Sequence, residues 1–137
     1  MNKVQSYKDL IAWQKAMDLV LTAYRLSATF PPREQYGLTA QLRRAAVSIP
    51  SNIAEGHGRR TRCDFVRFLD IARASANEVE TQVLLAERLE YVKPGDSSAC
   101  LDLCDEVQRI IKGLIISLER KDTARPTSQV SGLRTQG

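Results

Sequence analysis

The sequence is poor in the residues that mark several classes of protein. Its 137 residues include one histidine, one tryptophan and three cysteines, Cys63, Cys100 and Cys104. Their number is odd and their spacing does not match a disulfide framework, so no disulfides are predicted. We expect the three cysteines to be reduced and buried as small hydrophobic residues. With one histidine, and no motif for a nucleophile, a phosphate loop or a metal-ligand set, we expect no enzymatic activity, no metal and no cofactor.

Long apolar runs are also missing, so no transmembrane helix is predicted. Residues 1–13 do not have the pattern of a signal peptide, and we expect a cytoplasmic protein without a membrane partner. The net charge is a modest +4, but it is unevenly distributed. Residues 33–73 carry eight arginines against four acids, whereas residues 74–120 carry a net charge of −4. This asymmetry permits an anionic partner for the first of these segments.

Apolar residues recur at helical spacing over most of the chain. They predict four helices, over residues 10–28, 38–56, 61–91 and 97–120. Short connections between long consecutive helices predict an all-α fold, an antiparallel up-and-down four-helix bundle. Beyond residue 120 the periodicity is lost. We therefore expect one bundle domain over residues 1–120 and a disordered C-terminal tail over residues 121–137.

The first predicted helix has two apolar stripes. The stripe that recurs at three- and four-residue spacing predicts the core face: Leu10, Trp13, Met17, Val20, Leu21 and Tyr24. The reverse side carries Ile11, Leu19 and Leu26 at spacings of eight and seven residues. A monomeric bundle does not need this second stripe. We therefore expect it to form a subunit interface of a homo-oligomer.

The second predicted helix contains a proline and a polar row beside its core face. Pro50 removes a backbone donor, so a kink is expected there; a fresh helix start capped by Ser51 or Asn52 is the alternative. The core face consists of Leu38, Leu42, Ala45, Ala46, Ile49 and Ile53. The polar row consists of Gln41, Arg44, Ser48, Asn52 and Glu55.

The third predicted helix carries Ser75 and Glu78 beside its own core face. We expect the two polar rows to meet in a hydrogen-bonded seam, in which Arg44 or Asn52 pairs with Glu78. The alternative is that these polar side chains are solvated.

Four segments resemble a known family: LIAWQKAMDL, FPPREQYGL, YGLTAQLRRAAVSIPSNIAEGHGR and DFVRFLDIARAS. They are similar to motifs of the bacterial four-helix bundle family named after the 23S rRNA intervening sequence, and the resemblance covers residues 7–120. One departure is Ala74, where the family usually has glycine. The resemblance implies an up-and-down bundle, commonly a ring-shaped homopentamer, without known catalytic activity. It also implies a relationship to accessory proteins of diversity-generating retroelements, which bind nucleic acid and a reverse transcriptase.

The arginines around the junction of the second and third helices form the candidate binding site. Arg59, Arg60 and Arg62 lie within four positions, and Arg43 and Arg67 are expected nearby. Arginine suits bidentate contacts to phosphates. We therefore expect an oligomer that binds RNA or DNA through these arginines; the alternative is a scaffold that docks another protein and binds no nucleic acid.

Overall fold

The computed structural model describes residues 4–123, and within this range it contains helices and no strand. Two short 3-10 helices, η1 (Tyr7–Asp9) and η2 (Pro32–Glu34), precede the first two long helices. The long helices are α1 (Ile11–Ser27), α2 (Leu38–His57), α3 (Arg62–Arg88) and α4 (Pro94–Thr123). The predicted all-α, four-helix fold is confirmed.

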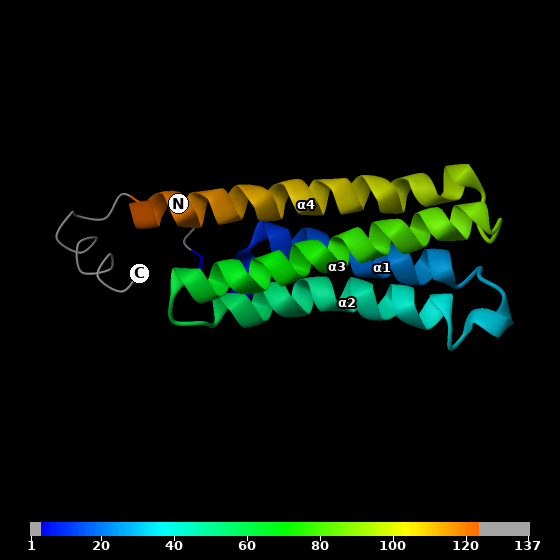
Figure 1. Cartoon of the computed structure of the whole chain (residues 1–137), viewed down its shortest axis with the longest axis horizontal. Helices are drawn as coiled ribbons and strands as arrows, with labels where there is room; N and C mark the ends of the chain where they lie inside the picture. The colour runs from blue at the N-terminus through cyan, green and yellow to red at the C-terminus, as the bar shows by residue number, and fades with distance from the viewer. Residues whose placement is uncertain (1–3, 124–137) are drawn as a thin grey trace, which may run out of the picture.

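The long helices form an antiparallel up-and-down bundle (Figure 1). Each helix packs against the next one along the chain, and α4 also packs against α1, whereas the diagonal pairs do not pack directly. The α2–α3 connection and the C-terminal end of α4 lie at one end of the bundle, which we call the α2–α3 end. The α1–α2 and α3–α4 connections lie at the other, the α3–α4 end.

One apolar core runs along the bundle. The predicted core face of α2 is confirmed, because its six residues are all buried. On α3, Leu69 and the apolar residues one and two turns further on are buried, whereas Phe65 and Phe68 are only half-buried. The largest fully buried apolar side chains are Leu19, Leu42, Ile49, Ile53, Leu69 and Ile111.

The predicted orientation of α1 is wrong. Leu19 and Leu26, which we expected at a subunit interface, are 0% and 7% exposed and belong to the core. They are joined there by three alanines of α1, Ala12, Ala16 and Ala23. Of the predicted core face, Leu10, Trp13 and Val20 are half-buried against the core, whereas Met17, Leu21 and Tyr24 are exposed. Small residues let α1 approach its neighbours closely, so side-chain size does not indicate which of two apolar stripes is buried.

The ends of the helices follow local chemistry. Ser6 and Asp9 form a capping box, which opens η1 rather than α1. α2 continues through Pro50 without a break, so the alternative of a second helix start is wrong. α4 continues to Thr123, three residues past the predicted boundary of the tail. The rest of the predicted tail, residues 124–137, lies outside the described residues.

Candidate nucleic-acid interface

The α2–α3 connection is short and fixed on both sides. A Cβ atom at Gly56 would lie 2.7 Å from Cβ of Phe68 and 3.0 Å from Cδ1 of Phe65, so a glycine is needed for this approach of the two helices. Five residues after Gly56 is Thr61, whose Oγ1 accepts a hydrogen bond of 3.0 Å from the backbone N–H of Asp64 and caps the start of α3. The arginines of this connection therefore sit on a rigid corner.

Two of these arginines lie against one aromatic ring. The guanidinium carbons of Arg59 and Arg67 are 4.7 Å and 4.6 Å from the ring centroid of Phe68. Arg59 also donates to Glu55 Oε2 at 2.8 Å, and Arg67 Nε lies 3.6 Å from Asp64 Oδ1. Cation–π attraction and these ion pairs orient both side chains. Because a guanidinium has five N–H donors, each can still donate to an external anion.

The other arginines of the predicted site differ in their surroundings. Arg60 is exposed, and its side chain makes no hydrogen bond or ion pair with the residues that the structure describes. Arg62, the first residue of α3, is half-buried. Arg59, Arg60, Arg62 and Arg67 therefore gather at the α2–α3 end, and we call them the arginine cluster.

Arg43 does not belong to this cluster. It lies in the second turn of α2, about 24 Å along the helix axis from Arg59. Its Nε donates to Oγ of Ser27 at 2.9 Å and its Nη2 to the carbonyl of Tyr24 at 3.2 Å. The guanidinium also lies 4.5 Å from the ring centroid of Tyr24. Arg43 therefore satisfies backbone and side-chain groups at the C-terminal end of α1, a structural role that the sequence pattern did not reveal.

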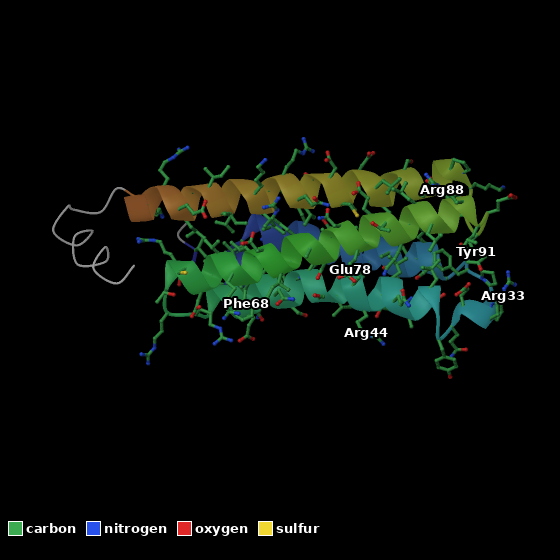
Figure 2. The ribbon with its side chains drawn as sticks, in the orientation of Figure 1. Arg33, Arg44, Phe68, Glu78, Arg88 and Tyr91 are labelled. Carbon is green, nitrogen blue, oxygen red and sulfur yellow. The ribbon has the colours of Figure 1, made fainter. Side chains whose placement is uncertain are left out.

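Phe68 is the residue of this site that the sequence pattern did not identify. It is half-buried at the edge of the core, near the α2–α3 end (Figure 2). The adjacent Arg67 was the available signal, since an arginine beside an aromatic residue at an apolar boundary favours a cation–π contact.

The predicted polar seam exists, but it is shorter than expected. The hydroxyl groups of Ser48 and Ser75 are 2.7 Å apart across α2 and α3. Nδ2 of Asn52 donates to the carbonyl and the hydroxyl of Ser48 at 2.8 Å and 3.0 Å. Gln41 and Glu55 are exposed, and Glu55 forms an ion pair with Arg59, four residues further along the chain. These two residues belong to the solvated surface rather than to the seam.

Arg44 and Glu78 flank a groove beside this seam rather than pairing with each other. Both are exposed, they lie on facing helices (Figure 2), and neither makes an ion pair with any described residue. The predicted pairing of Glu78 with Arg44 or Asn52 is therefore wrong. The groove has a volume of about 290 Å³. Its lining consists of Gln41, Arg44, Ala45, Ser48, Ser75, Glu78 and Gln82.

A hydrogen-bonded contact joins the two connections at the α3–α4 end. Tyr91 donates its hydroxyl to Oε2 of Glu34 at 2.6 Å, while Oε1 of Glu34 accepts from the backbone N–H of Leu38 at 2.9 Å. The hydrogen bond from Tyr91 and then that from Leu38 hold the pKa of Glu34 below its usual value. Arg33 lies 5.7 Å from the ring centroid of Tyr91, and both are at this end in Figure 2.

Trp13, Met17 and Val20 of α1 line an apolar groove between α1 and α2. Met17 and Val47 on its two sides are 38% and 41% exposed, and no charged residue lines it. Ile11, the third predicted interface residue, is exposed on α1 but outside this groove. The groove has a volume of about 330 Å³ and is lined by Tyr7, Trp13, Met17, Val20, Val47, Pro50, Ser51 and Ala54.

The cysteines divide into two kinds. Cys100 and Cys104 are buried in the core, as predicted, whereas Cys63 is exposed. The contact with Cys100 and burial raise the pKa of Cys104. Within residues 4–123 no group of histidine, cysteine or acidic side chains is arranged to hold a metal ion, and no helix is long and apolar enough to cross a membrane.

Fold and surface together define a small antiparallel four-helix bundle with an arginine cluster at one end and two grooves along α2. The chain belongs to the family of 23S rRNA-intervening sequence proteins, whose sequence pattern matches residues 8–113. A crystal structure from Bacteroides thetaiotaomicron, of a protein with unknown function from the S23 ribosomal protein family, matches with a TM-score of 0.71 and 24% identity. The match covers 77% of this chain and 98% of that chain, and it supports the fold alone. No curated protein sequence matches this chain.

Proposed function

We propose that this chain is a non-enzymatic, homo-oligomeric module that binds RNA or DNA through the phosphates, using the arginine cluster at the α2–α3 end. The observation that carries the proposal is the stacking of Arg59 and Arg67 on Phe68 beside the exposed Arg60. Two oriented guanidinium groups and a third one in solvent match the charge and geometry of a phosphate backbone.

The same contacts favour binding that is independent of base sequence. The ring of Phe68 is already in contact with two guanidinium groups, so it offers little free surface for stacking a base. Contacts to phosphates alone carry no sequence information. The proposed ligand is therefore the backbone of a nucleic acid rather than a particular sequence.

An oligomer strengthens this binding. Arg59 and Arg67 are partly neutralised by Glu55 and Asp64, so a single cluster binds weakly. In a ring, the cluster recurs once per subunit, and several weak contacts to one strand add up by avidity. The number of subunits that we propose, five, comes from the family resemblance.

The test is a mobility-shift titration with a single-stranded RNA at several salt concentrations. The variant Arg59→Gln/Arg60→Gln/Arg67→Gln removes three charges from the cluster. Binding by the wild type is expected to weaken steeply with salt, and the variant is expected to lose up to about 2 from the slope of log K against log salt, at roughly 0.7 per phosphate contact.

A matched control removes three charges from the other end of the bundle. Arg25, Arg88 and Lys93 are exposed, and their replacement by glutamine gives the same net charge. This control is expected to keep most of the affinity. Equal losses in both variants would mean that net charge alone attracts the nucleic acid and that the arginine cluster is not the site.

A second candidate function is docking of another protein, and the apolar groove between α1 and α2 favours it. An uncharged groove that exposes Met17 and Val47 is typical of a protein contact. A reverse transcriptase, the protein partner implied by the resemblance, is one candidate for its occupant. If the wild type retains no RNA or DNA even at low salt, this docking function replaces the first proposal.

A further inference from the structure

We propose that copies of this chain associate by inserting the outer face of α4 of one copy into the groove between α2 and α3 of the next copy. The groove carries Arg44 and Glu78 on its two sides, and α4 carries Asp105 and Arg109. The inference rests on the homo-oligomer of the proposed function and specifies which surfaces form it.

The groove between α2 and α3 has small residues on its floor and unpaired polar groups on its sides. Its floor contains small residues, Ala45 and Ser75 among them, so a helix can approach closely. Arg44 and Glu78 are exposed on opposite sides without an ion pair among the described residues. Oε1 of Gln82 is buried and accepts no hydrogen bond there. The two unpaired charges are satisfied by a partner that brings both a cation and a carboxylate.

The outer face of α4 carries these groups. Asp105 and Arg109 form an ion pair of 3.4 Å on the helix surface, with side chains 69% and 70% exposed. One turn further on is Gly113, in the middle of the helix, where an added Cβ would meet nothing within 4 Å. Glycine weakens a helix, and the packing of this chain does not require it here. Next to it, Ile116 is 43% exposed. A close approach by another copy accounts for both residues.

The heights of these residues along the bundle agree. Ser97 donates to Glu87, so these two residues lie at the same height on antiparallel α4 and α3. Counting away from this contact at about 1.5 Å per residue on both helices brings Ile71 level with Gly113. In a cyclic ring whose axis runs along the bundle, every copy lies at the same height. Ile71, which is 39% exposed on α3, therefore faces Gly113 of the neighbouring copy.

The same count aligns the charges. Glu78 comes within one turn of Arg109, a distance that an arginine side chain spans. The contact between Ser48 and Ser75 sets the height of α2, and it places Arg44 level with Asp105. On the neighbouring α4, Asp105 is thus the carboxylate nearest in height to Arg44, and Arg109 is the cation nearest in height to Glu78. An exposed ion pair contributes little to stability, so exchanging the pair within α4 for pairs across the contact costs little.

The two surfaces are different, which decides the kind of assembly. A contact between unlike surfaces is heterologous: each copy uses its groove toward one neighbour and its α4 toward the other. Repetition of such a contact gives a ring when the rotation between neighbours closes, and the ring proposed here is the one that the family resemblance implies. α3 also runs antiparallel to α4 within one chain, so a parallel ring of copies gives the antiparallel approach of α3 and the neighbouring α4 that the count requires.

The experiment measures the mass of the assembly by light scattering for the wild type, Glu78→Arg, Arg109→Glu and the double variant Glu78→Arg/Arg109→Glu. Each single variant places like charges opposite each other and is expected to weaken association roughly tenfold or more. The double variant restores opposite charges and is expected to recover the mass of the wild type. Arg25→Glu, an exposed reversal on α1 outside both surfaces, is the control and is expected to keep that mass.

A steric variant tests the contact independently of charge. Gly113→Lys adds a long side chain where the single copy has open space, so the melting temperature of the bundle is expected to hold while the assembly dissociates. An oligomer that withstands the single reversals, or single variants that the double variant does not rescue, would overturn this interface and leave the proposed oligomer standing. A wild type with the mass of one chain, 15.3 kDa, would overturn the interface and the oligomer together. RNA binding is measured separately and is not decided by either result.

Discussion

Replacing Gly56 by alanine tests how the α2–α3 end is held together. The added Cβ would lie 2.7 Å from Cβ of Phe68, 3.0 Å from Cδ1 of Phe65 and 3.3 Å from the carbonyl oxygen of Phe65. Two of these three atoms are a Cβ and a backbone oxygen, which cannot move by rotating a side chain. The two helices must therefore separate, or the corner must shift.

The expected magnitude follows from two opposing terms. Alanine favours a helix over glycine by at most about 1 kcal/mol, and by less near the end of α2. Overpacking a filled core costs about 1–3 kcal/mol, and the rigid neighbours place this site at the upper end of that range. We expect the variant to lose about 2 kcal/mol of unfolding free energy. Arg59 should also shift relative to Phe68, so affinity for RNA should fall in the same variant.

Urea denaturation followed by circular dichroism measures this change. Gly95→Ala is the control, because Gly95 lies in the first turn of α4 with nothing within 4 Å of the added Cβ. It is expected to leave stability unchanged or to raise it slightly. If Gly56→Ala proves as stable as the wild type, the contact with Phe65 and Phe68 does not fix the corner, and the argument for a preorganised arginine cluster is refuted.

Two further predictions concern polar contacts. Asn52→Ala should lower the unfolding free energy by about 1 kcal/mol, since Asn52 donates to Ser48 in a half-buried seam. Glu55→Ala should change it by less, because the ion pair of Glu55 is exposed; equal losses in urea denaturation would place Glu55 inside the seam after all. In the folded state the pKa of Glu34 lies below its ordinary value of 4.5. The ionised Glu34 therefore contributes to the unfolding free energy above pH 4.5, and this contribution is lost as the pH falls through the folded pKa. Glu34→Gln should therefore destabilise the protein at neutral pH and flatten the loss of stability in acid, relative to the wild type; an acid profile parallel to that of the wild type would contradict the role assigned to the Tyr91 contact.

Most of the helical architecture followed from local signals in the sequence. The predicted second helix ends within one residue of the end of α2, and the predicted third helix begins at Thr61, the residue that caps α3. The core face of α2 was also correct, because its apolar stripe lies next to a row too polar to be buried as a whole. The predicted first helix had no such contrast. Both of its stripes were apolar, and the spacing did not reveal that Leu19 and Leu26 of the second stripe belong to the core.

The candidate site was predictable only where its residues are neighbours in sequence. Arg59, Arg60, Arg62 and Arg67 stand close along the chain and come together at one corner of the bundle. Arg43 was assigned to the same site, but its guanidinium group reaches back to the end of α1, which is distant in sequence. The partners of a long, flexible side chain depend on which groups lie near it in the folded protein, and these distances cannot be read from a single sequence.

Local signals in the sequence were enough to predict the four helices, their order and the antiparallel topology, because periodicity, caps and short connections act between residues a few positions apart. Three features came from the tertiary structure: the face of α1 that is buried, the contact of Phe68 with two arginines, and the groove with Arg44 and Glu78 unpaired on its two sides. These features depend on the separation and rotation of neighbouring helices. The packing of the whole core sets both, since a helix turns toward its neighbours the stripe that lets the backbones approach most closely.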